Sequence, residues 1–162
     1  MAILAFDPQA FGPAIAALLV PERLMEVGPG SPNLAMRPAL AAVKANPACR
    51  SALWLLHDFL DESHTISQEL DTAEGRFWHA IMHRREPDAS NSKYWWRRVG
   101  SHPVLKQLAA EAATLGYTYT KPFDFVDFCE RVRGTGTPEE ELARRVQILE
   151  WRLLFDACFQ AG

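Results

Sequence analysis

Cysteine is scarce in this sequence, and its spacing excludes a disulfide framework. Cys49, Cys129 and Cys158 are the three cysteines among 162 residues. They lie far apart, and no two have the separation of a metal-binding or redox Cys-x-x-Cys pair. Cys129 and Cys158 have apolar neighbours, so we expect both to be small buried residues. This cysteine usage is typical of a reducing compartment, and the sequence therefore predicts a cytoplasmic protein.

Long hydrophobic runs are also missing. The apolar run near the N-terminus, residues 11–20, contains Gly12 and Pro13, and no Lys or Arg precedes it. A secretory signal needs a basic region before its apolar core, and a transmembrane helix needs about 20 apolar residues. We therefore expect a soluble protein without a membrane partner.

The chain has no excess of positive charge. Its net charge is −3, which argues against general binding to nucleic acid. The charge is nevertheless uneven, because residues 76–106 carry seven Lys and Arg against two Asp and Glu, whereas both flanking segments are acidic. Positive charge is thus concentrated in one segment.

Signals for β-strands are almost absent, the short run at residues 116–120 being the one exception, and we expect it to connect helices. Helix signals are strong by contrast. At several expected helix starts, Asp, Asn or Thr stands directly before Pro, or a capping residue is followed by an acidic residue in the first turn. With a hydrophobic fraction of 48%, the sequence predicts one all-α domain over residues 1–162, a helical bundle of seven or eight helices. The expected helices cover residues 7–19, 34–45, 46–60, 71–87, 88–99, 102–115, 122–133 and 137–162.

Two matching polar stripes are the most informative feature. His57, Asp61 and His64 stand at positions i, i+4 and i+7, and His79, His83 and Glu86 repeat this spacing. On a helix such residues fall within about 60° of one another on one face. His64 joins the first stripe only if the third helix continues past Ser63. Whether the two stripes face each other is left open by the sequence.

The stripes carry ligands that suit a transition metal. His57, Asp61, His64, His79 and His83 are the candidate ligands, and a nitrogen and carboxylate set of this kind suits Zn, Fe, Mn or Ni rather than Ca. Ala80 occupies the position at which a zinc protease of the H-E-x-x-H type has its Glu, which argues against that device.

Two other interpretations of the stripes remain open. The histidines could form an acid–base or ligand-binding cluster without a metal, or they could be buried and hydrogen-bonded for structural reasons. Gly75 lies on the same side of its helix as the second stripe, which would let another backbone come close.

The basic segment is rich in aromatic residues and could bind an anion. Arginine recognises carboxylate or phosphate through two hydrogen bonds, and indole rings can stack on a flat ligand. Structure alone could also explain these residues, because Arg stems often cover an apolar face. The candidate residues for binding a small anionic ligand are Arg84, Asn91, Lys93, Tyr94, Arg98 and His102.

Two family resemblances follow from these motifs. Residues 75–103, GRFWHAIMHRREPDASNSKYWWRRVGSHP, with the preceding LDESHTISQEL, resemble a signature of bacterial and fungal proteins of unknown function. This likeness covers roughly residues 50–106, which marks that segment as the functional unit without implying a reaction. In length, helicity and histidine content the chain also resembles DinB-like helical bundles, which implies a metal held by three histidines from different helices.

Three functional hypotheses follow. In the first, His79, His83 and Glu86 are catalytic, a metal-bound water or a His/Glu pair acts as base, and the arginines stabilise negative charge. In the second, the same cleft holds an anionic metabolite without turnover. In the third, the protein is structural and forms homo-oligomers through Trp95 and Trp96.

Overall fold

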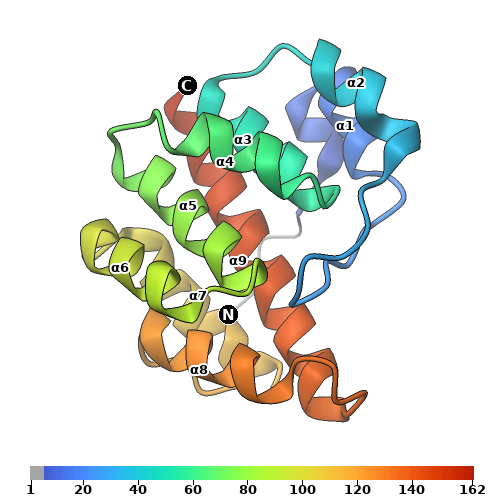
Figure 1. Cartoon of the computed structure of the whole chain (residues 1–162). Coiled ribbons are helices and arrows are strands. Elements are labelled where there is room, and N and C mark those ends of the chain that lie inside the picture. Colours follow the sequence, from blue (N-terminus) through green and yellow to red (C-terminus); the bar gives the residue numbers. More distant parts are fainter. Residues whose placement is uncertain (1–5) are drawn as a thin grey trace.

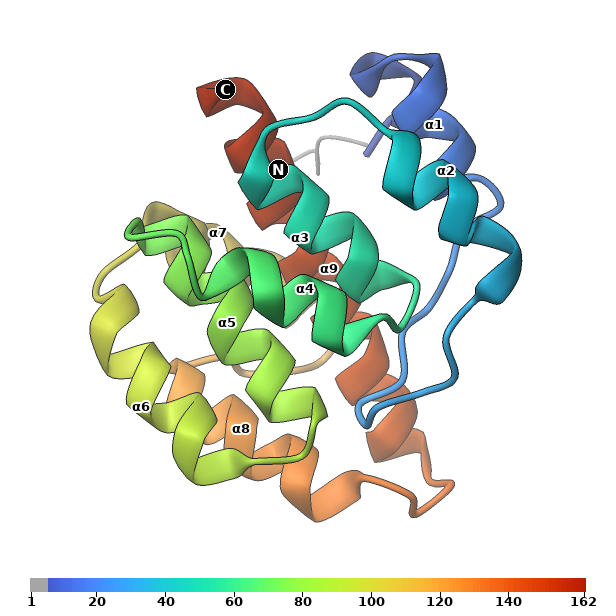
Figure 2. The same ribbon diagram turned by 45° about the horizontal axis from the view of Figure 1, so that its top comes forward.

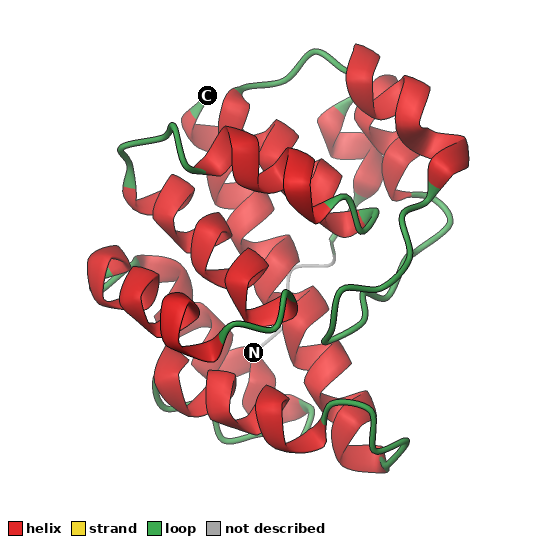
Figure 3. Cartoon of the chain, in the orientation of Figure 1, coloured by secondary structure: helices red, strands yellow, loops and turns green. Residues whose placement is uncertain are grey.

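The computed structural model describes residues 6–162 and is all-α over that range, as the sequence predicts (Figures 1 and 3). The short 3-10 helices are η1 (Pro8–Phe11) and η2 (Leu34–Met36). The α-helices are α1 (Pro13–Leu19), α2 (Arg37–Ala42), α3 (Pro47–Leu56), α4 (Leu60–Ser67), α5 (Ala73–Arg85), α6 (Ala89–Val99), α7 (Pro103–Thr114), α8 (Pro122–Val132) and α9 (Pro138–Ala161).

Proline and capping residues start most of these helices where the sequence predicts. Pro47, Pro103 and Pro138 stand at first helical positions, where a missing N–H costs nothing. The Asn46 side chain accepts a hydrogen bond from the Cys49 N–H at 2.9 Å, which satisfies one of the free donors at the start of α3.

Three expected helices differ from the structure. Gly12, at φ 90°, divides the expected first helix into η1 and α1, and the second is divided into η2 and α2, ending at Ala42. The third helix ends at Leu56, and α4 begins at Leu60 after a sharp turn. The fourth helix begins as predicted, but Thr72 rather than Asp71 is its N-cap, accepting from the Gly75 N–H at 3.0 Å.

Asp58 makes the turn between α3 and α4. Its φ of 68° lies in the left-handed region, which ends the helix and which Asp tolerates better than most residues. The Asp58 carboxylate pairs with the fully buried Arg85 and, at 2.7 Å, with Arg23. Arg85 also donates to the Leu55 carbonyl at 2.7 Å. These bonds join the turn to the end of α5 and satisfy a buried charge.

The long helix α9 organises the core. It runs behind α3 and α5 along most of the molecule, and α7 and α8 pack against its other parts (Figures 1 and 2). One cluster of buried side chains joins α1, α3, α5 and α9, and a second joins α7, α8 and α9. Helix α4 packs on α3 and α5 at the outside, and α6 packs on α5. This arrangement places α4, α5 and α6 side by side at one face.

The three cysteines are free and buried, which confirms the prediction for Cys129 and Cys158. Burial raises the pKa of the Cys129 thiol to about 11 and that of Cys158 to about 12. Between residues 6 and 162, no helix combines the length and hydropathy required to cross a membrane.

Candidate metal site

Helices α4 and α5 bring three histidines together. His64 of α4 lies against His79 and His83, which are one turn apart on α5. The Nε2 atoms of His64 and His79 are 3.1 Å apart. The ring centroids of His64 and His83 are 5.3 Å apart, and those of His79 and His83 are 4.8 Å apart. We call these three residues the histidine cluster.

The cluster is largely shielded from water. His79 is 3% exposed and His83 is 5% exposed, while His64 is half-buried. Trp95 of α6 stacks on the His79 ring with a centroid distance of 4.0 Å and an interplanar angle of 22°. A third helix therefore covers the cluster.

Burial favours the neutral form of two imidazoles of the cluster, those of His64 and His79. Burial, reinforced by the neighbouring His83 and His64, lowers the pKa of His79 to about 3. Burial and the neighbouring His83 also lower the pKa of His64. The carboxylates of Glu86 and Asp61 raise it, but by less, so the pKa stays below its ordinary value. A neutral imidazole keeps a lone pair on one ring nitrogen, and this is the form that ligates a metal.

Glu86 fixes the orientation of His83. The Glu86 carboxylate accepts a hydrogen bond from His83 Nδ1, with an Nδ1–Oε1 distance of 3.0 Å. When Nδ1 alone carries a proton, the Nε2 atom of His83 keeps its lone pair. A carboxylate behind a metal-ligating histidine is a common arrangement, because it sets the tautomer and makes the ligand more basic.

The dimensions of the cluster fit a transition-metal ion. Zn–N bonds of about 2.0–2.1 Å in tetrahedral geometry place two ligand nitrogens about 3.3 Å apart, close to the 3.1 Å between His64 Nε2 and His79 Nε2. One nitrogen from each of the three histidines lies within 4.8 Å of the others. Three protein nitrogens leave a fourth position for water or a ligand.

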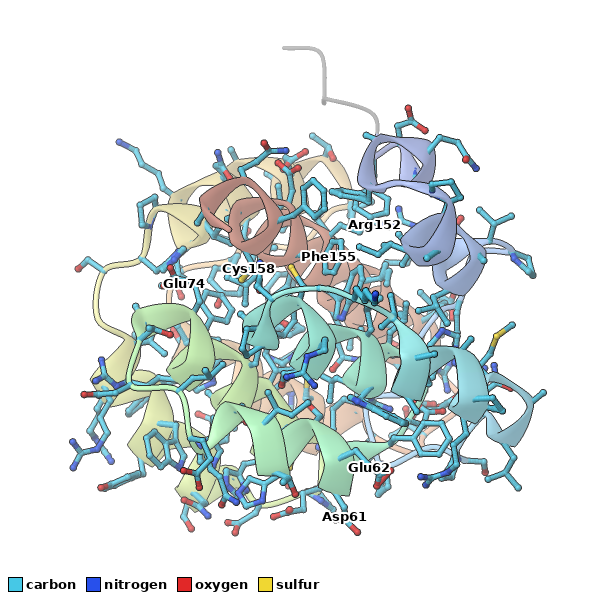
Figure 4. The ribbon with its side chains drawn as sticks, turned by 90° about the horizontal axis from the view of Figure 1, so that it is seen from above. Asp61, Glu62, Glu74, Arg152, Phe155 and Cys158 are labelled. Carbon is cyan, nitrogen blue, oxygen red and sulfur yellow. The ribbon has the colours of Figure 1, made fainter. Side chains whose placement is uncertain are left out.

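His57 and Asp61 do not belong to this cluster, which corrects the expected first stripe. His57 is 3% exposed, and its Nε2 donates to the Leu18 carbonyl at 2.8 Å while its Nδ1 accepts from Asn33 Nδ2 at 3.1 Å. Both ring nitrogens are thus occupied by structural bonds. Asp61 is exposed in the first turn of α4 and points to the outside of the molecule (Figure 4). The turn at Asp58 separates His57 from the helix that carries His64, whereas Asp61 shares α4 with His64 but lies on its exposed side.

Arg84 is a core residue rather than a ligand-binding one, contrary to the expectation from the sequence. Its guanidinium is fully buried and donates to both carboxylate oxygens of Glu150, at 2.6 and 3.1 Å, and to Gln147 Oε1 at 3.1 Å. Both terminal nitrogens of the guanidinium thus donate to side chains of α9, which commits them to the fold.

The other residues expected to bind an anion lie along α6 and at the start of α7. Lys93 pairs with Asp127 of α8 at 2.6 Å. Arg98 is exposed and lies over Tyr94, 4.4 Å from its ring centroid, and 6.0 Å from that of Trp95. Arg98 and Tyr94 thus flank the indole that covers the histidine cluster.

His102 and Asn91 have local roles in the helices. His102 caps α7 by accepting from the Val104 N–H at 3.2 Å, and its other ring nitrogen is 3.6 Å from Glu74. Asn91 is half-buried, and its backbone N–H donates to Asp88, the N-cap of α6.

Trp95 and Trp96, which the third hypothesis places at an interface, both pack against side chains of the same chain. Trp96 is 4% exposed and packs edge-on against Phe77, with ring centroids 4.8 Å apart. One face of Trp95 is occupied by His79.

Two features of the site escaped the sequence analysis. Asp88, expected only as a helix cap, groups with His83 and Glu86, so that one ligand atom from each lies within 4.8 Å of the others. Its separation of five residues from His83 is not a helical spacing, so no periodic pattern could reveal it. The stacking of Trp95 on His79 was missed as well, because it depends on how α6 packs against α5.

Comparisons of the chain with protein-family models, with curated protein sequences and with solved structures gave no match. Function is therefore inferred from the geometry of the site.

Proposed function

We propose that this protein binds one divalent transition-metal ion through His64, His79 and His83. The observation that carries the proposal is the convergence of three imidazoles on one point, with His64 Nε2 and His79 Nε2 already at ligand separation. Nitrogen ligands of this kind suit Zn, Fe, Ni or Mn. The carboxylate behind His83 adds the outer-shell partner that such sites usually have.

The open position of the metal would take water or a small anion. The cation is the largest charge in such a site and attracts negative ligands. Arg98 and Tyr94 beside Trp95 supply positive charge and a flat surface near the cluster. If the protein is an enzyme, a metal-bound water would be its base or nucleophile. If it is a binding protein, the anion would be held without turnover.

The first resemblance agrees with this proposal, whereas the likeness to DinB-like bundles does not extend to the arrangement of the ligands. All three histidines lie within residues 50–106, the segment that resembles the bacterial and fungal signature. In DinB-like bundles three histidines come from different helices, whereas here His79 and His83 share α5 and His64 comes from α4.

Cobalt binding tests the proposal directly. Wild-type protein stripped of metal is titrated with Co²⁺, whose visible absorption reports nitrogen coordination, and then with Zn²⁺ in competition. We expect His64→Ala to weaken Co²⁺ binding. Loss of an outer-shell partner costs roughly 10- to 100-fold in metal affinity, and loss of a direct ligand should cost more. His64 is half-buried, so this variant disturbs the core less than His79→Ala would.

His102→Asn is the matched control. It removes a histidine outside the cluster and keeps an N-cap residue at the start of α7, so Co²⁺ affinity should stay at the wild-type value. A wild-type protein that takes up no Co²⁺, Zn²⁺, Ni²⁺ or Mn²⁺ at millimolar concentration would overturn the proposal. The 3.1 Å contact between His64 and His79 would then be a structural hydrogen bond.

A further inference from the structure

A second group of ligand atoms lies directly behind His83. Glu86 Oε1 is 3.0 Å from His83 Nδ1, and His83, Glu86 and Asp88 each offer one ligand atom that lies within 4.8 Å of the other two. This group stands at the connection between α5 and α6, and its contact with Glu86 uses Nδ1, so that Nε2 of His83 is left for the histidine cluster.

The backbone holds these three residues in place. The Asp88 N–H donates to the His83 carbonyl at 2.7 Å, and the Glu86 N–H donates to the Met82 carbonyl at 3.0 Å. Both bonds tie the connection to the last turn of α5. The turn therefore fixes the backbone positions from which the three side chains project.

The carboxylates retain unused acceptor capacity. Asp88 Oδ1 caps α6, accepting from the Asn91 N–H at 3.2 Å and the Ser90 hydroxyl at 3.3 Å, whereas a carboxylate has two oxygens and about four acceptor positions. The Glu86 side chain is 42% exposed, and Asp88 is half-buried. A cation could reach both from solvent and keep part of its water shell.

We propose that His83, Glu86 and Asp88 form a second site for a divalent cation, which shares the His83 ring with the histidine cluster. The inference rests on the proposed function in one respect, because His83 bridges two ions only when the first site is occupied. One nitrogen and two carboxylates suit a borderline transition metal such as Zn²⁺ or Cu²⁺ better than Ca²⁺. The separation of His83 Nδ1 and Glu86 Oε1 matches two ligands of one ion with bonds of about 2.0–2.2 Å.

Binding at the second site changes the protonation of His83. The proton that Nδ1 donates to Glu86 leaves to the buffer, and the Nδ1–metal bond replaces the N–H bond. The ring then bridges the two ions as an imidazolate. The two carboxylates and the imidazolate carry negative charge that offsets much of the added positive charge. The repulsion between the two dications is thereby reduced.

Stoichiometry and electron paramagnetic resonance with Cu²⁺ test this inference. Metal-free wild-type protein is expected to bind two equivalents of Cu²⁺. Because a bridging imidazolate couples the two unpaired spins, the integrated signal at liquid-helium temperature should fall below that of two isolated ions. Isothermal titration in buffers of different ionisation enthalpy should show one additional proton released with the second equivalent.

Asp88→Ser is the informative variant. Serine caps a helix as well as aspartate does, so α6 should remain intact while the carboxylate ligand is lost. We expect one equivalent of Cu²⁺ and an uncoupled signal. Thr137→Ser, which replaces one capping residue by another far from the cluster, should still bind two equivalents.

The possible failures can be told apart. One equivalent in the wild type that is unchanged in Asp88→Ser and lost in His64→Ala would overturn the second site and leave the histidine cluster standing. One equivalent that is lost in Asp88→Ser and unchanged in His64→Ala would overturn the histidine cluster. Two equivalents with no coupling, retained in Asp88→Ser, would place the second ion elsewhere and contradict the bridge.

Discussion

At the scale of single residues, burial and pairing decide the role of each charged side chain. Arg84 and Arg98 both come from the basic segment, yet Arg84 is enclosed with Glu150 whereas Arg98 is exposed on α6. Burial alone would lower the pKa of Arg84, but the Glu150 carboxylate outweighs it and holds the pKa above its ordinary value. A buried pair of this kind is costly to break, because each charge depends on the other for solvation.

Arg84→Met should therefore lower the free energy of unfolding by about 3–5 kcal/mol, since it leaves the Glu150 charge buried without a partner. The double variant Arg84→Met/Glu150→Met removes both charges and should cost less than Arg84→Met alone. Urea unfolding followed by circular dichroism measures both. Arg98→Met, the exposed control, should stay within about 0.5 kcal/mol of wild type. Equal losses in Arg84→Met and Arg98→Met would contradict the assigned role of the ion pair.

At the scale of helices, the site depends on how closely the segment after α4 approaches α5. Gly75, predicted to let another backbone come near, lies close to the backbone of Leu70. A Cβ atom at Gly75 would stand 2.8 Å from the Leu70 carbonyl oxygen and would also overlap the Leu70 side chain. Gly75 lies one turn before His79, so this contact sets the position of α5 relative to α4 and its His64.

Gly75→Ala should destabilise the protein although alanine is the better helix former by about 1 kcal/mol. Overlap with backbone that cannot move freely costs about 1–3 kcal/mol, so we expect a lower melting temperature and weaker Co²⁺ binding through displacement of His79 from His64. Thermal unfolding and cobalt titration measure the two effects. An increase in stability would show that the residues before α5 yield easily, and the proposed control of helix position would fail.

At the scale of the whole molecule, the neutral histidines couple folding to pH. The folded-state pKa of His79, about 3, lies below the value near 6.5 of the unfolded chain. Between these values the unfolded state binds a proton that the folded state does not. The stabilisation is therefore complete above pH 6.5 and is lost as the pH falls. His57 and His64, whose pKa values are also lowered mainly by burial, act in the same direction.

Metal-free protein should accordingly lose about 2 kcal/mol of unfolding free energy from His79 alone between pH 7 and pH 5. Urea unfolding at half-unit steps of pH measures this slope. His79→Gln, which cannot titrate, should flatten it. A slope that is the same in His79→Gln and wild type would mean that the ring is solvated and free to protonate in the folded protein.

Local sequence determined the helical class and most helix boundaries of this protein, because capping side chains and prolines act within a few residues of the helix they begin. It also singled out His79 and His83, since helical spacing alone places them on one face. Tertiary structure decided which residues join them. His64 reaches the cluster because a left-handed turn at Asp58, held by the buried Arg85, starts a new helix. That same turn leaves His57 in the core. Such choices depend on contacts between residues far apart in the chain, and no periodic pattern encodes them.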